Sequence, residues 1–416
     1  MDSRNTHCLV IGAGAVGASC ALHLVDAGYR VTLVDRLEPG MGTSYGNAAC
    51  ISPSQVGPYS YPGVWKNIPR WLLTREGPMT IRWGDLPWTA PWLWRFWREG
   101  NAAGVERCGQ AQAALMRHVH DDYAAQLERT GQTGLLKSKG LVVLYDTEAA
   151  FEGDRWRYDL GARHGFGWER ISTAELKRHR PPIQHDGVAL YVPSWKHTLD
   201  PAKMTAGFAH AAIEAGARWV NDTVEAVIAG DGRVTARLAG GETLEGDRLV
   251  VAAGPWSNQL AAQLDYAVPM APKRGYHTMI AEPGLDLGGP VMSGDRAFVM
   301  TPLADGLRLA GTAEFARLDA APNYRRAKVL VDSARRYLPD LGAGGATEWL
   351  GQRPMMADSL PVISPSPGHP EVIYAFGHGH YGLTQGPTTG RLVTALLSGD
   401  SPGLDLSPYR FDRFRR

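Results

Sequence analysis

Residues 8–36, CLVIGAGAVGASCALHLVDAGYRVTLVDR, decide how the rest of the chain is interpreted. The apolar run before the first glycine predicts a buried strand, and Gly12, Gly14 and Gly17 form a Gly-x-Gly-x-x-Gly turn that opens an Ala/Leu-rich helix. The first glycine makes the tight turn, the second lets the backbone approach a pyrophosphate, and the third lets helix and strand pack closely. A second strand ends in Asp35, placed to accept hydrogen bonds from a ribose hydroxyl. This register predicts a dinucleotide site; the alternative is a glycine-rich turn in an unrelated α/β unit.

Composition limits the architecture and the partners. A chain of 416 residues is long enough for two domains of ordinary size. Its 43 Lys and Arg against 42 Asp and Glu leave a formal charge of +1, so we expect no nucleic-acid partner. The four cysteines lack zinc-type spacing and indicate reduced structural thiols in a cytoplasmic protein. The nearly uncharged run 8–25 contains three glycines and no basic leading region, which argues against an export signal or a membrane span.

The segment 58–97 holds seven of the chain's thirteen tryptophans, together with Arg70, Arg75, Arg82 and Arg95. Its six prolines exclude a continuous spanning helix. Aromatic and basic residues together are typical of a surface that lies on a bilayer, here the inner face of the cytoplasmic membrane. The alternative, which we favour, is that the rings fill the core of a second domain or an interface.

Other patterns place the remaining elements. The loop 40–53 is rich in small and hydroxyl residues and is either a pyrophosphate-binding loop or an ordinary surface loop. The stretch 248–257 repeats the opening pattern in weaker form and is either a cofactor contact or a plain strand-to-helix turn. The further predicted elements are a long helix at 101–131, a strand at 140–145, a helix from Pro201 capped by Asp200, a strand-rich stretch at 266–345, a strand at 372–376 and a last helix at 388–399.

Eight motifs follow one another along essentially the whole chain: GAGAVG with VDR, GTSYGNAACISP, WLL…WLWRFW, KRGYH, GLRLAGTAEF, GQRPMMADSLPVIS and GHGHYGLTQGPTTG. In this order they resemble the D-amino-acid oxidase superfamily of flavoproteins, and within it the D-amino-acid dehydrogenase group. The resemblance implies FAD as cofactor and an α/β fold, a Rossmann-type FAD-binding domain with an inserted α+β substrate domain that carries a mainly antiparallel sheet. It implies an FAD-binding domain at 1–51, 199–265 and 346–416, and a substrate-binding domain at 52–198 and 266–345.

Carried over by position, the resemblance also implies the site residues. Arg353 looks like the arginine that holds the substrate carboxylate, because a planar guanidinium binds a carboxylate bidentately. The other implied substrate-binding residues are Tyr276, His277, Phe298, Glu314, His380 and Tyr381. The cofactor-binding residues are Gly12, Ala13, Gly14, Ala15, Val16, Gly17, Asp35, Arg36, Thr43, Ser44, Asn47, Ala48, Val224, Ala253, Gly254, Trp256, His378, Gly379, Gly382, Leu383 and Thr384. We assign no catalytic base and expect no metal, because the two histidines 378 and 380 have no third ligand at suitable spacing.

The implied reaction removes the α-hydrogen of a D-amino acid as hydride to flavin N5, and water hydrolyses the imino acid to a 2-oxo acid and ammonia. A cyclic substrate such as D-proline or hydroxy-D-proline would give a cyclic imine by the same step. The electrons then pass to a quinone or another carrier. Two alternatives stay open: an oxygen-using oxidase of glycine, sarcosine or D-amino acids, and the flavin subunit of a larger amine-oxidising complex.

Overall fold

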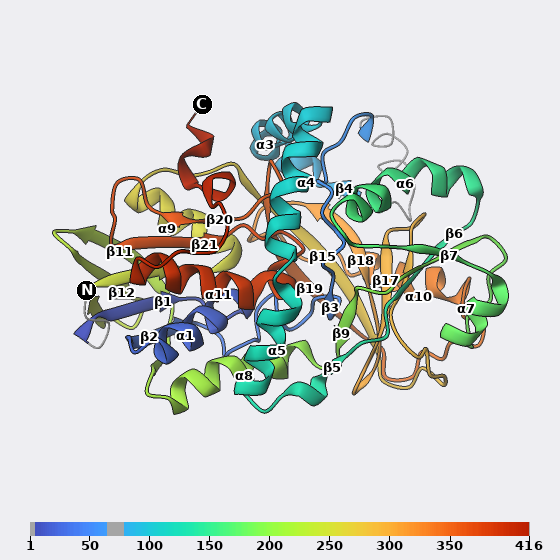
Figure 1. Ribbon diagram of the computed structural model, residues 1–416, viewed down its shortest axis with the longest axis horizontal. Helices are drawn as coiled ribbons and strands as arrows, with labels where there is room; N and C mark the ends of the chain where they lie inside the picture. Colours follow the sequence, from blue (N-terminus) through green and yellow to red (C-terminus); the bar gives the residue numbers. More distant parts are fainter. Residues whose placement is uncertain (1–4, 65–78, 416) are drawn as a thin grey trace.

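The computed structural model describes residues 5–64 and 79–415, and its two largest sheets lie toward opposite ends of the long axis (Figure 1). The first sheet has the strand order β10 (Arg218–Asn221), β2 (Arg30–Asp35), β1 (His7–Ile11), β14 (Arg248–Val251), β21 (Val372–Phe376) and β20 (Val362–Pro365). All neighbouring pairs are parallel except β20 with β21. The predicted strands at 8–11 and 372–376 are confirmed as β1 and β21, and both are buried in this mainly parallel sheet.

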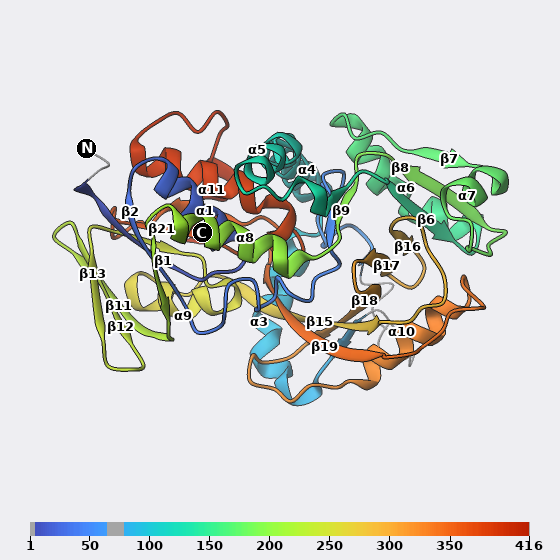
Figure 2. The same ribbon diagram turned by 90° about the horizontal axis from the view of Figure 1, so that it is seen from below.

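Helices cover one face of this sheet and a small sheet covers the other (Figure 2). Cys8 and Val10 pack with α1 (Ala15–Asp26), α8 (Pro201–Glu214) and α11 (Gly382–Ser398). Leu9 and Ile11 pack with α9 (Ser257–Leu264) and with the antiparallel strands β11 (Val224–Gly230), β12 (Arg233–Leu238) and β13 (Thr243–Gly246). Because successive strand residues point to opposite faces, one short strand contributes to two hydrophobic cores.

The second sheet has nine strands and is mainly antiparallel. Its order is β19 (Thr347–Met356), β15 (Met270–Ile280), β18 (Gly306–Phe315), β17 (Phe298–Leu303), β16 (Val291–Ser293), β6 (Leu141–Tyr145), β8 (Val188–Val192) and β7 (Glu169–Ile171), with β4 (Met79–Ile81) beside β18. Only the pairs β16 with β6 and β18 with β4 are parallel. The α/β fold class with a mainly antiparallel second sheet is thus confirmed; the division of the chain into two domains at the predicted boundaries stays a prediction.

The remaining elements join and cover the two sheets. They are the small sheet β3 (Cys50–Ile51), β9 (Lys196–Thr198) and β5 (Leu136–Lys137), the helices α4 (Ala102–Met116), α5 (Val119–Arg129), α6 (Glu148–Arg163), α7 (Thr173–His179) and α10 (Arg325–Arg335), and the short helices η3 (Thr133–Leu135), η4 (Gly254–Trp256), η5 (Ser407–Tyr409) and η6 (Phe411–Phe414). The predicted cap of α8 is confirmed, since the Asp200 carboxylate accepts a hydrogen bond from the Lys203 N–H.

The prediction of a single helix at 101–131 is wrong. The helix is broken between α4 and α5, at two residues that carry no helix-breaking signal.

The last helix begins earlier than predicted, at Gly382, although Pro387 lies inside it. A proline has no N–H, so the carbonyl of Leu383 one turn earlier loses its helical partner. The hydroxyl of Tyr123, on α5, donates a hydrogen bond to this carbonyl. A residue from a neighbouring helix therefore satisfies the group that the proline leaves unpaired, which is why the sequence signal for a helix start at 388 was misleading.

Of the tryptophans in the described part of the segment 58–97, only one is buried in the core. Trp92, on α3 (Leu86–Glu99), is buried against Phe315, and its indole N–H donates to the Met355 carbonyl. The four other tryptophans within the described part of the segment, Trp83 of η2 (Trp83–Asp85), Trp88, Trp94 and Trp97, are exposed, Trp83 by 70%. For these four, the prediction that the rings fill the core is wrong, and the prediction that they lie in an interface stays a prediction. Trp65, Trp71, Arg70 and Arg75 lie outside the described residues, within which no helix is long and apolar enough to span a membrane.

Candidate active site

A cavity of about 720 Å³ lies at the carboxyl ends of four parallel strands. It is bordered by the turn after β1, by Asp35 at the end of β2, by the turn after β14 and by the loop after β21. This edge of an open parallel sheet is where α/β proteins bind ligands, because the loops there converge and the helix N-termini point toward it.

The glycine turn has the geometry that close packing requires. Gly12 has φ +107°, and a Cβ there would lie 2.4 Å from the Ala252 carbonyl oxygen. A Cβ at Gly17 would lie 1.8 Å from the Gly12 carbonyl oxygen, so any side chain would push α1 away from β1. A Cβ at Gly14 would meet only the Ser44 hydroxyl, at 3.3 Å, so the backbone is open toward the cavity at that position.

The loop 40–53 is folded against the start of α1. The Ser44 hydroxyl accepts a hydrogen bond from the Ala15 N–H at 2.9 Å, and the Asn47 side-chain amide donates to the Ser44 carbonyl at 2.8 Å. The Thr43 hydroxyl donates to the Gln352 carbonyl at 3.0 Å, which joins the loop to β19. These bonds place small and hydroxyl residues beside the positive N-terminus of α1, the arrangement expected of an anion-binding loop.

Asp35 and Arg36 form another part of the cavity wall. The Asp35 carboxylate accepts hydrogen bonds from the N–H groups of Ala13, at 2.7 Å, and Leu37, at 3.0 Å. The Arg36 guanidinium lies over the Trp256 ring, 4.1 Å from its centroid. The Asp35 carboxylate can accept further hydrogen bonds, so it can bind a ribose hydroxyl, and the positive N-terminus of α1 can bind a pyrophosphate. Together these groups fit a dinucleotide.

Most of the predicted cofactor-binding residues line this one cavity. They are Gly12, Gly14, Ala15, Val16, Asp35, Arg36, Thr43, Ser44, Asn47, Val224, Ala253, Gly254, Trp256, His378, Gly379, Gly382 and Leu383. Ala13, Gly17, Ala48 and Thr384 do not line it. The Ala48 carbonyl accepts from the Thr301 hydroxyl, and the Thr384 hydroxyl accepts from the Ser52 N–H, so these two positions support the wall from behind.

Arg353 reaches the same cavity from β19, beside His380. Its guanidinium lies over Gly275 of the neighbouring strand, where a Cβ would stand 2.1 Å from Nη2. Burial lowers the pKa of Arg353 to about 10, which still leaves it charged at neutral pH. Within the described residues, no carboxylate forms an ion pair with this guanidinium. A partly buried cation beside a cavity, with no carboxylate partner among the described residues, is a candidate anion site.

The other predicted substrate-binding residues separate onto the two faces of the second sheet. Tyr276 and Glu314 share a 2.7 Å hydrogen bond in a buried cluster with Arg274, on the face that α10 covers. Phe298 is buried in the core on that face. His277 is on the other face, where Nδ1 lies 2.9 Å from the Gly46 carbonyl oxygen. None of the four lines the cavity, and neither does Tyr381, which is buried against Tyr59.

The two histidines of the loop before α11 are held neutral. Burial lowers the pKa of His378 to about 3, and its Nε2 lies 3.0 Å from the Thr389 hydroxyl. The pKa of His380 is well below the usual value because of burial and of the charges of Lys273 and Arg353. Among residues 5–64 and 79–415, no group of three or more His, Cys, Asp or Glu could hold a metal ion.

Sequence reasoning missed three residues beside Arg353. Lys273 is the Cα partner of Arg353 on β15, and its Nζ lies 4.8 Å from the ring centroid of Tyr59. Arg157, on α6, adds a second cation near Lys273 and Tyr59. Lys273 opens the quoted KRGYH motif, so a signal for it was present in the sequence; Tyr59 and Arg157 had none.

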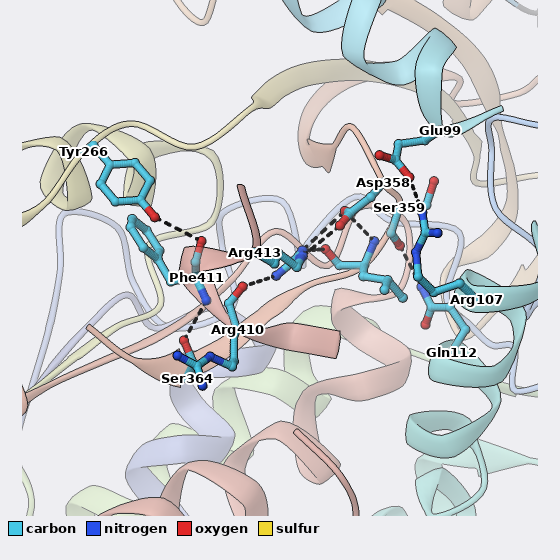
Figure 3. Close-up of polar contacts among 11 residues, drawn as sticks. Glu99, Arg107, Gln112, Tyr266, Asp358, Ser359, Ser364, Arg410, Phe411 and Arg413 are labelled. Carbon is cyan, nitrogen blue, oxygen red and sulfur yellow. Dashed lines mark hydrogen bonds and ion pairs between the residues drawn. The ribbon is translucent and has the colours of Figure 1, made fainter. Parts of the chain in front are cut away.

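A network at the C-terminal end of the chain links Arg413 to Asp358, next to Ser359 (Figure 3). Arg413 pairs with Asp358 at 2.7 Å and donates to the Leu360 carbonyl at 2.8 Å. The neighbouring Ser359 accepts a hydrogen bond from the Tyr59 N–H on its hydroxyl, at 3.1 Å, and one from the Gln112 side chain on its carbonyl, at 2.8 Å. The last residues of the chain therefore support the wall next to Arg353.

The sheet, the glycine turn and the continuous cavity are together those of a dinucleotide-binding enzyme. The chain belongs to the FAD dependent oxidoreductase family DAO, which matches residues 7–396. The predicted family is thereby confirmed, and FAD is the cofactor of this oxidoreductase, as predicted.

Two named relatives are similar over nearly the whole chain. A D-amino-acid oxidase of Bradyrhizobium diazoefficiens is 34% identical over 417 residues, covering 98% of this chain and 99% of that protein. A D-amino acid dehydrogenase of Paramagnetospirillum magneticum is 31% identical over 428 residues, covering 98% of each. Among solved structures, glycine oxidase from Geobacillus kaustophilus has a TM-score of 0.75 at 21% identity, covering 98% of this chain and 99% of that one, a likeness of fold.

Proposed function

We propose that this protein catalyses the FAD-dependent oxidative deamination of D-amino acids. The observation that carries the proposal is Arg353, a cation without a carboxylate partner among the described residues, at the wall of the flavin cavity. Support comes from the two named relatives, one a D-amino-acid oxidase and one a D-amino acid dehydrogenase, which match this chain from end to end. The proposed substrates are D-amino acids, with D-proline and hydroxy-D-proline among the candidates.

The residues that line the cavity divide into two roles in this proposal. The glycine turn, Ser44 and the N-terminus of α1 hold the pyrophosphate of FAD, and Asp35 holds a ribose hydroxyl. Arg353 holds the substrate carboxylate and fixes which face of the α-carbon is presented. When bound there, FAD would supply the acceptor for the α-hydrogen and its bonding electron pair, and hydrolysis of the imino acid would give a 2-oxo acid and ammonia.

No side-chain base is required if the amine of the substrate is neutral when the α-hydrogen leaves. His380 is uncharged, because burial and two neighbouring cations lower its pKa. A neutral imidazole beside Arg353 adds no repulsion toward a substrate ammonium group, and its unpartnered Nδ1 is free to accept a hydrogen bond. These groups position the substrate and leave the chemistry to the cofactor.

Anaerobic reduction of the flavin tests the proposal. Mixing the holoenzyme with D-alanine, D-proline or other D-amino acids should bleach the oxidised flavin absorbance, while the matched L-amino acids should not. Ammonia and the corresponding 2-oxo acid, or a cyclic imine from D-proline, should appear in amounts equal to the flavin reduced. Absence of bleaching by a full panel of D-amino acids would refute the proposal and favour a flavin subunit that needs other partners.

We infer that the reduced enzyme passes its electrons to a quinone or another carrier at a membrane surface. Support comes from α3, where exposed Trp88, Trp94 and Trp97 lie on one short helix with Arg95 and Arg98. Indole rings and arginines on an amphipathic helix suit the interface of an anionic bilayer. The rival acceptor is oxygen, and the relative named as an oxidase supports it. Rates of flavin reoxidation by oxygen and by a soluble quinone, measured side by side, decide between them.

Vesicle sedimentation tests the membrane contact. Wild-type protein should co-sediment with anionic phospholipid vesicles, and Trp94→Ala/Trp97→Ala should reduce the bound fraction. Arg233→Ala/Arg237→Ala is the matched control, because these exposed arginines lie on β12, at the far end of the molecule (Figure 1). If wild-type protein stays in the supernatant, the exposed tryptophans serve another contact.

A further inference from the structure

Two cations lie side by side at the edge of the cavity, Arg353 on its lining and Lys273 just outside it. Lys273 and Arg353 are Cα partners on the antiparallel strands β15 and β19, so both side chains leave the same face of the sheet. The next pair on that face is Gly275 with Gly351, and both glycines line the cavity; their missing side chains make room for the Arg353 guanidinium over Gly275 and for the Trp349 ring beside Gly351. Like charges directly opposite each other in a sheet are destabilising, so the presence of this pair indicates a role other than stabilising the fold.

The surroundings of the pair supply aromatic rings and a further cation. The Lys273 ammonium lies over the Tyr59 ring, and His380 meets the same ring edge-on at 4.6 Å. The guanidinium of Arg157 is paired with Asp154, at 3.4 Å, so part of its positive charge is offset. Within the described residues, neither Lys273 nor Arg353 has an ion pair with a carboxylate. Two positive charges therefore lie side by side at this end of the cavity, with Arg353 on its lining and Lys273 next to Arg353 just outside it, and no carboxylate among the described residues pairs with either.

One substrate carboxylate neutralises only one of these charges. We propose that the enzyme is selective for D-amino acids that carry a second anionic group on the side chain, with the α-carboxylate on Arg353 and the side-chain carboxylate on Lys273. The substrate class is the acidic D-amino acids, D-aspartate and D-glutamate. The inference rests on the proposed function, since it names the substrate of that same site.

A second role for Lys273 would be to accept a proton from the substrate amine. Burial, with the charges of Arg353 and Arg157, lowers the pKa of Lys273 to about 7, so part of the population is neutral at neutral pH. The ring of Tyr59 beside Nζ favours the charged form by a cation–π contact and so supports anion binding over a base. The two roles predict different effects of a Lys273 substitution on kcat/KM. Loss of a base would lower kcat/KM for all amino acids, because they share the amine, whereas loss of an anion-binding group would lower it only for acidic ones.

The test compares isosteric pairs, D-glutamate with D-glutamine and D-aspartate with D-asparagine, by anaerobic flavin reduction and by steady-state kinetics. A hydrogen-bonded charge pair is worth roughly 10- to 100-fold in an equilibrium constant, so wild-type kcat/KM should favour each acid over its amide by that factor. Lys273→Gln should bring the ratio to within about threefold of one. Lys273→Arg should restore part of the preference, and Lys203→Gln, an exposed lysine on α8, should keep the wild-type ratio.

Each outcome separates this inference from the proposed function. If neutral D-amino acids bleach the flavin as well as or better than D-glutamate, the inference is wrong while the proposed function stands. If Lys273→Gln lowers kcat/KM equally for D-glutamate and D-glutamine, Lys273 acts on the shared part of the substrate, and the inference is also overturned. If no D-amino acid of either kind reduces the flavin, the proposed function itself fails. The wild-type ratio needs no variant, so the inference remains testable even if Lys273→Gln does not fold.

Discussion

Arg353 is the residue on which the proposed chemistry depends most directly. Arg353→Ala should lower kcat/KM for a D-amino acid by on the order of 30-fold to several thousand-fold, because losing one partner of a desolvated charge pair costs roughly 2–5 kcal/mol. Arg353→Lys should recover part of this loss, since an ammonium restores the charge without the planar fork. Steady-state kinetics with FAD content measured in parallel gives the answer. A loss of under threefold with full FAD content would mean that the carboxylate is held elsewhere.

Lys273 gives the pocket a pH dependence whose sign follows from its charge. Its pKa is lowered from 10.5 to about 7, so the positive charge is present below pH 7 and is lost above it. The charged and titratable groups that face it are Arg353 on β19, Arg157 on α6, Tyr59, and His380, which stays neutral. The ratio of kcat/KM for D-glutamate to that for D-glutamine should therefore fall by up to about tenfold per pH unit above pH 7.

The amide serves as an internal control in that profile, because ionisation of the substrate amine affects both members of the pair alike. In Lys273→Arg the guanidinium stays charged, so the ratio should no longer change between pH 6 and pH 9. A wild-type ratio that stays flat over the same range would show that the charge of Lys273 does not contribute to the selection of substrate.

At the scale of elements, the strand–turn–helix unit separates two kinds of glycine. Gly14→Val should leave the fold nearly intact, because only the Ser44 hydroxyl is close to the new side chain, yet it should block the approach of the pyrophosphate. Gly17→Val places a side chain where a Cβ already lies 1.8 Å from the Gly12 carbonyl oxygen, so it should destabilise the apoprotein as well. Absorbance near 450 nm and thermal unfolding of the apoproteins distinguish the two variants. Full FAD content in Gly14→Val would show that the pyrophosphate does not pass this position.

At the scale of the whole molecule, the C-terminal segment joins the end of the chain to the turn after β19 through Arg413 and Asp358 (Figure 3). Arg413→Ala leaves the 14%-exposed Asp358 without its partner, so the free energy of unfolding should fall by about 1–3 kcal/mol. Arg410→Ala is the matched control: its ion pair with Asp412 is exposed, so its loss should change the free energy of unfolding little. Thermal unfolding of both variants measures the difference. Equal Tm values would show that the Arg413 network does not contribute to stability.

Local sequence determined the part of this protein that depends on short-range packing. The turn Gly12–Gly17, Asp35 at the end of β2 and the Asp200 cap lie within elements whose chemistry is local, and the order of motifs pointed to the flavoprotein family. The positions of Gly12 and Gly17 could be predicted from the sequence, because each glycine lies against a neighbouring carbonyl and no other residue fits there.

Only the tertiary structure decided which residues share the pocket. Strand alternation puts Lys273 and Gly275 on the same face of the sheet as Arg353, and it puts Arg274 and Tyr276 on the opposite face. Because this strand is buried on both faces, its sequence does not show which residues point toward the pocket. Antiparallel register then sets Lys273 opposite Arg353, two residues far apart in the chain. Pairing between distant strands is a property of the assembled sheet. For that reason the sequence alone did not predict that Lys273 and Arg353 lie next to each other.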